Sequence, residues 1–149
     1  MGGKIGMKIR IEDKLIGEEE PCFIIAEAGV NHNGSIELAK KLIDAAKDAG
    51  ADAVKFQTFK TENVVVKDAQ KAEYQKETTG EGSQYEMIKK LELAEEGFRE
   101  LADYAKEKDI MFLSSPFDKE SVDLLHELDV PAFKVGSGEI KISHCSDTY

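Results

Sequence analysis

Seven charged or polar side chains fall in, or directly after, segments that are otherwise apolar and have strand character. Lys55 and Gln57 lie two residues apart, so their side chains point to the same face of an extended strand. A charge within a strand that is covered on both faces is costly unless it is paired or liganded. Lys55 and Lys134 both occur in such a setting, which predicts a site for an anion. The full set of candidates is Glu27, Lys55, Gln57, Ser115, Lys134, Ser137 and Glu139.

Each candidate has a simpler explanation when it is considered alone. A single lysine at the edge of a sheet can bury its methylene groups and extend its amine to water. Glu27, which follows the apolar stretch 23–26, is either the partner of a lysine or an active-site carboxylate. The backbone of Gly136-Ser137-Gly138 could bind phosphate through its N–H groups, although so short a motif is weak evidence. The argument for a site therefore depends on the candidates acting together.

The three histidines, His32, His126 and His144, show no spacing typical of metal ligands. His32 belongs to the sequence Asn-His-Asn-Gly at 31–34, which predicts a turn before an N-cap at Ser35, because Asn and Gly tolerate positive φ. We interpret His32 as a structural residue or as a support for the site, and His126 as a solvated helix residue.

Four segments rich in apolar, β-branched or aromatic residues predict strands, at 23–28, 53–58, 110–114 and 132–136. Their nearly continuous apolar character is typical of a parallel sheet covered on both faces. Between them, apolar residues recur at helical spacing, with Gly50 after the first helix and Asp118 as an N-cap. The pattern predicts an α/β protein built from βα units, in which ligands bind at the carboxyl ends of the strands.

Two segments depart from this rhythm. Residues 8–16 alternate around Glu12-Asp13-Lys14, which predicts a β-hairpin before the first strand of the sheet. Residues 59–95 are too long for a simple connection, and within them Ser83 and Glu86 fit a capping box that begins a helix. Long insertions after the carboxyl end of a strand are usually functional.

The chain has 149 residues and a net charge of −10 at pH 7, from 20 basic and 30 acidic side chains. An acidic surface argues against nucleic acid as a partner, since phosphate binding requires clustered Lys and Arg. No apolar run approaches the roughly 18 residues of a membrane helix, and residues 1–20 lack the apolar region of a signal peptide. We therefore expect a cytoplasmic protein without a membrane partner, and we expect Cys22 and Cys145 to be reduced thiols.

Five stretches, in this order, resemble the N-acetylneuraminate (sialic acid) synthase family, which includes the legionaminate and pseudaminate synthases. They are IIAEAGVNHNG (24–34), ADAVKFQTF (51–59), SQYEMIKKLEL (83–93), FLSSPFD (112–118) and PAFKVGSGEI (131–140). The resemblance implies the N-terminal half of a TIM (β/α)8 barrel, with about four parallel βα units preceded by the hairpin, because a full barrel takes about 250 residues. The implied organisation is a hairpin extension at 1–20, a partial barrel at 21–140 and an atypical tail at 141–149.

The family condenses phosphoenolpyruvate with an open-chain N-acetylated amino sugar, such as N-acetylmannosamine, to a nine-carbon 2-keto sugar acid and phosphate. By resemblance, the catalytic positions are Glu27 and Glu139, and the substrate-binding positions are Lys55, Gln57, Ser115, Lys134 and Ser137. The resemblance also implies a divalent cation, Mn or Mg, whose histidine ligands come from later strands that have no match here. The expected partners are the two small-molecule substrates and, because a four-strand arc leaves an open edge, a second copy of the chain.

Two other functions stay open. In the first, the chain is a Schiff-base aldolase in which Lys134 or Lys55 attacks a carbonyl carbon. In the second, it is a non-catalytic, truncated paralogue that binds phosphoenolpyruvate or serves as an interaction module. Because the four strands end near the midpoint of a barrel, the activity of this chain on its own is an open question.

Overall fold

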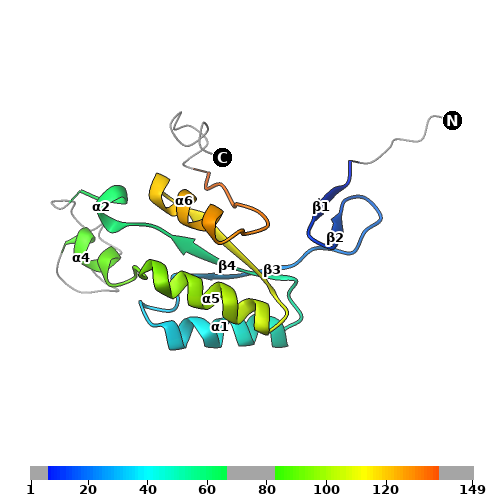
Figure 1. Cartoon of the computed structure of the whole chain (residues 1–149), viewed down its shortest axis with the longest axis horizontal. Helices are drawn as coiled ribbons and strands as arrows, with labels where there is room; N and C mark the ends of the chain where they lie inside the picture. The colour runs from blue at the N-terminus through cyan, green and yellow to red at the C-terminus, as the bar shows by residue number, and fades with distance from the viewer. Residues whose placement is uncertain (1–6, 67–82, 138–149) are drawn as a thin grey trace.

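A parallel sheet forms the centre of the protein (Figure 1). The computed structural model describes residues 7–66 and 83–137. The strand order is β3-β4-β5, with β3 at Ile25–Gly29, β4 at Ala53–Thr58 and β5 at Met111–Pro116. The α/β class and these three strands are confirmed, with each strand end within two residues of the predicted one. All six residues of β5 are buried, as the continuous apolar pattern predicted.

The prediction of a fourth strand at 132–136 is wrong. This segment carries one parallel bridge, between Ser114 and Phe133, and the Lys134 N–H donates to the Ser114 carbonyl at 3.3 Å. Pro131, directly before it, has no N–H to donate. No strand among the described residues lies on the far side of the segment, so it has one neighbour where an internal strand would have two.

Three helices pack on one face of the sheet and bury the apolar stripes that the sequence predicted. They are α1 (Ile36–Asp48), α5 (Glu95–Glu107) and α6 (Lys119–Glu127). Figure 1 shows α1 and α5 running side by side. Their apolar faces meet Val54 and Phe56 of β4 in the main core. The predicted N-cap at Asp118 is confirmed, and Gly50 ends the α1 region with φ +77°.

A β-hairpin lies at the amino ends of the strands. It consists of β1 (Ile9–Ile11) and β2 (Lys14–Ile16), which pair antiparallel as predicted. Ile11 packs on a second cluster formed by Ala53, Met111 and Leu113, whose side chains point away from the main core. Lys14 pairs with Asp52 at 3.2 Å just before β4. The hairpin thus covers the amino end of this face and leaves the carboxyl ends of the strands open.

The described part of the insertion after β4 contains two short helices, α2 (Thr61–Val64) and α4 (Gln84–Lys89). The predicted capping box at the start of α4 is confirmed, because Ser83 accepts from the Glu86 N–H and the Glu86 side chain accepts from the Ser83 N–H. Residues 67–82 lie outside the described residues.

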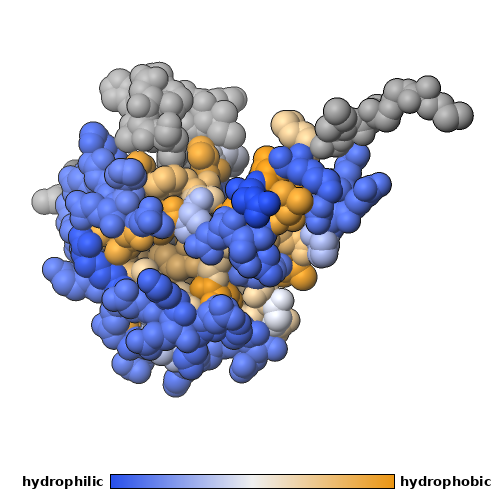
Figure 2. Space-filling view, turned by 45° about the vertical axis from the view of Figure 1, so that its right-hand side comes forward, coloured by the Kyte–Doolittle hydropathy of each residue, from blue (hydrophilic) through white to orange (hydrophobic). Residues whose placement is uncertain are grey.

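Apolar surface is exposed on the sheet and hairpin. Figure 2 shows apolar side chains gathered in the middle of one face, within a rim of hydrophilic ones. Ile24 and Ile25, at the start of edge strand β3, are 53% and 43% exposed. The open edge agrees with the expectation of a second copy, which stays a prediction. No helix among residues 7–66 and 83–137 is long and apolar enough to cross a membrane.

Candidate functional site

An ion pair between neighbouring strands forms the centre of the candidate site. Glu27 of β3 and Lys55 of β4 are register partners, and the Lys55 ammonium group donates to Glu27 Oε2. The two side chains differ in burial: that of Lys55 is 10% exposed and that of Glu27 is 54% exposed. Of the two explanations for Glu27 left open by the sequence, pairing with a lysine is therefore confirmed. The half-exposed carboxylate also remains accessible to a ligand.

The side chain of Gln57 lies near the ion pair because the backbone of β3 is irregular after Glu27. The register shifts between Glu27 and Gly29, and Gly29 adopts a φ of +53°. A Cβ atom on Gly29 would lie 3.3 Å from Glu27 Oε1 and 3.7 Å from Gln57 Nε2. A side chain on Gly29 would therefore crowd the Glu27 carboxylate and contact the Gln57 amide, so both groups lie next to Gly29. The structure thus brings Glu27, Lys55 and Gln57 together.

Replacing Gly29 with alanine tests this crowding. Gly50→Ala is a matched control, because Gly50 has φ +77° but no atom within 4 Å of its Cβ position. The left-handed backbone alone destabilises alanine by about 1–2 kcal/mol at either position. We expect Gly29→Ala to lower the free energy of unfolding, measured by urea denaturation, by roughly 1 kcal/mol more than Gly50→Ala does. Equal losses would show that Glu27 does not crowd Gly29.

Ser115 belongs to the same face of the sheet as the ion pair. It is the register partner of Gln57 and is 3% exposed. Its neighbour Ser114 faces the helices, where its hydroxyl and that of Thr58 form a buried hydrogen bond of 2.7 Å. The alternation along β5 therefore separates a structural serine from a serine at the site.

The structure does not place the remaining candidates at the ion pair. Lys134 and Ser137 are exposed, and Lys134 makes no ion pair with any described residue. Lys134 is not a buried charge, so the sequence argument that counted it as one is wrong. Its segment makes one isolated bridge to β5 and is not a strand of the described sheet. Glu139 lies outside the described residues.

Two acidic side chains hold the loops at the carboxyl ends of the strands through hydrogen bonds. The sequence did not assign either of them to the site. Asp118, known from the sequence as an N-cap, also accepts the Lys60 N–H at 2.7 Å and so connects the ends of β4 and β5. Glu92 accepts the N–H and the hydroxyl of Thr61 at 2.9 and 2.5 Å. Burial acts to raise the pKa of Glu92, but the bonds from Thr61 and Lys89 outweigh it and lower that pKa. No local sequence signal marks Glu92.

His32 is buried in the turn between β3 and α1. It is 1% exposed, and its Nδ1 accepts the Gly34 N–H at 3.0 Å. Its Nε2 is buried without a hydrogen-bond partner in the described part of the chain. Burial lowers the pKa of His32 below 6.5, so the ring is neutral at pH 7.

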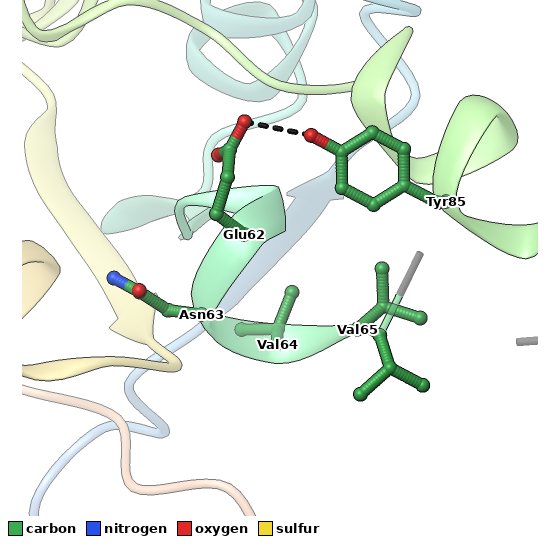
Figure 3. A pocket seen from close by; sticks show the side chains of 6 residues that line it. Glu62, Asn63, Val64, Val65 and Tyr85 are labelled. Carbon is green, nitrogen blue, oxygen red and sulfur yellow. Dashed lines mark hydrogen bonds between the residues drawn. The ribbon is translucent and has the colours of Figure 1, made fainter. Parts of the chain in front are cut away.

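A pocket of about 310 Å³ lies in the insertion and not at the ion pair (Figure 3). Its walls are Glu62, Asn63, Val64, Val65, Val66 and Tyr85. Figure 3 shows the Tyr85 hydroxyl pointing at the Glu62 carboxylate, to which it donates at 2.8 Å. We place the candidate site at the ion pair, because buried charge and converging donors define it there, whereas this pocket is open and its one carboxylate is already paired.

The Glu62 carboxylate is expected to titrate at low pH. The hydrogen bond from Tyr85, a backbone hydrogen bond and the bond from Lys89 lower its pKa to about 2. Because this pKa is below the ordinary value of 4.5, the contact between α2 and α4 is fully stabilising above pH 4.5 and is lost as the pH falls towards 2. The ¹³C shift of the carboxyl carbon measures this, and Tyr85→Phe should move the midpoint back towards 4.5. A wild-type midpoint near 4.5 would contradict the contact.

No group of three or more His, Cys, Asp or Glu side chains in residues 7–66 and 83–137 is arranged to hold a metal ion. The described residues therefore do not fit the divalent cation that the resemblance implies. The cation stays a prediction from the resemblance.

Comparison with known proteins identifies relatives along most of the chain. A family model described as the NeuB family matches residues 42–145. The N,N'-diacetyllegionaminic acid synthase of Legionella pneumophila is 53% identical over 135 residues, which are 87% of this chain and 38% of that protein. The enzyme of the same name from Campylobacter jejuni is 58% identical over 119 residues, which are 79% of this chain and 36% of that protein.

The fold has counterparts among solved structures. The N-acetylneuraminic acid (sialic acid) synthetase of Leptospira borgpetersenii in complex with citrate matches with a TM-score of 0.72 and 33% identity, over 91% of this chain and 43% of that chain. The chain thus spans little more than a third of the length of the curated relatives it matches.

Proposed function

Because the chain belongs to the NeuB family, we propose that it carries the phosphoenolpyruvate side of a site that condenses phosphoenolpyruvate with an N-acylated amino sugar. Relatives more than 50% identical are named as synthases of a nine-carbon sugar acid, N,N'-diacetyllegionaminic acid. The proposal includes a (β/α)8 barrel to which β3, β4 and β5 belong, with the substrates at the carboxyl ends of these strands.

The observation that carries the proposal is the buried Lys55 side chain on β4, the middle strand of the described sheet. An ammonium group has three N–H donors, and Glu27 occupies one of them. The other donors have no hydrogen-bond partner among the described residues and can bind an anion, in a setting where low polarity strengthens charge interactions. Phosphoenolpyruvate carries a carboxylate and a phosphate, so it matches a cation that faces the open end of the strands.

Neighbouring polar groups supply the further contacts. Gln57 and Ser115 are register partners on the face of Lys55, so an amide and a hydroxyl lie beside the cation. We assign Lys134, Ser137 and Glu139 to the same site by family resemblance. The Lys134 N–H donates to the Ser114 carbonyl of β5, and β5 also carries Ser115.

In the proposed reaction, the methylene carbon of phosphoenolpyruvate attacks the sugar aldehyde and forms the new C–C bond. Water adds to the adjacent carbon, and the C–O bond to phosphate then breaks, which leaves the 2-keto acid and inorganic phosphate. Water loses two protons: the first balances the one that the aldehyde oxygen gains, and the second leaves the new hydroxyl for the departing phosphate as the ketone forms. Glu27 and Glu139 are the carboxylates proposed to move these protons, and Lys55 holds the negative charge of the phosphoenolpyruvate.

Calorimetric titration of the full chain with phosphoenolpyruvate tests the proposal. We expect phosphoenolpyruvate to bind at least about tenfold more tightly than pyruvate or inorganic phosphate, because it presents two anionic groups to one cationic site. Equal affinity for the three ligands, or no binding, would refute a phosphoenolpyruvate site. Binding without turnover in the presence of N-acetylmannosamine and Mn²⁺ would favour the non-catalytic alternative.

Borohydride treatment in the presence of pyruvate separates the proposal from a Schiff-base aldolase. The Lys55 amine donates to Glu27 as an ammonium group, and an ammonium group has no lone pair with which to attack a carbonyl. We therefore expect no pyruvate adduct by mass spectrometry. An adduct on Lys55 or Lys134 would support the aldolase.

A further inference from the structure

His32 has one partner for its two ring nitrogens. Nδ1 accepts the Gly34 N–H at 3.0 Å and so carries no proton. In the neutral ring the proton is therefore on Nε2, which is buried without a partner among the described residues. Burying an unpaired N–H is unfavourable, and an apolar side chain of similar size would avoid that penalty. Space filling alone does not explain a histidine here, whereas the acceptor at Nδ1 does.

The bond from Gly34 fixes a turn that has little freedom to move. Gly34 has φ +76°, and a Cβ on it would lie 2.4 Å from the Lys90 carbonyl oxygen. The turn therefore touches the backbone of the α4–α5 connection. Glu92, two residues further along that connection, accepts the N–H of Thr61 at the start of α2. The turn after β3 and the loop after β4 are thus held together through this connection.

The ring of His32 also supports the strand that carries the cation. Its centroid lies 6.1 Å from that of Phe56, which is fully buried between Lys55 and Gln57 in the sequence of β4. Phe56 is also the register partner of Gly29, the residue that lies next to the Glu27 carboxylate and the Gln57 amide. His32 therefore contacts the back of the segment whose front carries the ion pair.

We propose that His32 is a positioning residue, which holds the turn after β3 through its Nδ1 acceptor and thereby fixes the relative placement of Glu27, Lys55 and Gln57. The effect on ligand binding rests on the proposed function, because it assumes that phosphoenolpyruvate binds at Lys55. The effect on the geometry of the free protein does not.

Two substitutions of His32 distinguish the effect of its hydrogen-bond acceptor from the effect of its size. His32→Asn places an amide oxygen near the Nδ1 position and keeps an acceptor for Gly34, whereas His32→Gln places its amide near Nε2 and leaves the Gly34 N–H without one. In ¹H–¹⁵N spectra of the free full-length chain, we expect His32→Gln to shift the Gly29 amide and the Gln57 side-chain amide and His32→Asn to leave both near their wild-type positions. Equal shifts in both variants, or none in either, would overturn the proposal.

Ligand binding and the wild-type tautomer provide independent checks. We expect His32→Gln to weaken phosphoenolpyruvate binding about tenfold and His32→Asn less than about threefold, since small displacements at a site have large effects. Absence of binding by the wild type would refute the proposed function, while the spectra of the free protein would still decide the role of His32. Long-range ¹H–¹⁵N spectra of the wild type need no variant, and a proton on Nδ1 would overturn the proposal even if His32→Gln failed to fold.

Discussion

Replacing Lys55 with methionine is expected to weaken phosphoenolpyruvate binding at least about 100-fold, because it removes the buried cation that faces the ligand. Methionine keeps an unbranched side chain of similar length, so the methylene packing within β4 is preserved. The Glu27 carboxylate is left without its partner, but its side chain is 54% exposed and stays hydrated. We therefore expect a change of at most about 1 kcal/mol in the free energy of unfolding.

Isothermal titration calorimetry on the full chain measures the affinity, and urea denaturation measures the stability. The matched control is Lys119→Met, which removes a cation from the i,i+4 pair with Asp123 on the exposed side of α6. That substitution lowers the net charge by the same amount but should leave the affinity unchanged. If both variants lost affinity equally, phosphoenolpyruvate would be responding to the overall charge, and Lys55 would not bind it directly.

The parts of the fold that could be predicted from sequence are those that depend on burial or on hydrogen bonds between residues close in sequence. β4 and β5 are buried on both faces, so their apolar runs were enough to predict them as strands without knowledge of the rest of the chain. The caps at Asp118 and Ser83 are local hydrogen bonds within one helical turn, and they too were predicted. The prediction of a fourth strand failed because 132–136 makes a single bridge to β5, at Phe133, whereas a strand needs consecutive pairing with a neighbour, which a local pattern does not report.

The sequence predicted candidate residues for the site but not which of them contact each other. A parallel sheet brings Glu27 and Lys55 to the same edge, yet which of two lysines the carboxylate would meet depends on strand register. The register shift before Gly29, which places Gln57 beside Glu27, is an irregularity of one residue with no signature in the sequence. Glu92 meets Thr61 across 31 positions of chain, so no local pattern could reveal that bond.

Replacing Asp118 with alanine is expected to have the largest effect on stability. The buried carboxylate accepts three hydrogen bonds: from the Ser121 N–H at 2.9 Å, from the Ser121 hydroxyl at 3.0 Å and from the Lys60 N–H at 2.7 Å. Loss of an N-cap costs about 1 kcal/mol, and leaving a buried N–H unpaired costs about 1–3 kcal/mol more. We expect the free energy of unfolding to fall by roughly 2–4 kcal/mol.

Ser35→Ala is the matched control for this prediction, because Ser35 caps α1 through the Leu38 N–H alone. It should cost about 1 kcal/mol, so the difference between the two variants measures the bond that joins the loop after β4 to α6. Amide hydrogen exchange at Lys60 reports the same bond directly and should accelerate in Asp118→Ala and not in Ser35→Ala. If the two variants lost equal stability and Lys60 exchanged at the wild-type rate in both, Asp118 would be a cap alone, and the ends of β4 and β5 would be held together by their ladder hydrogen bonds.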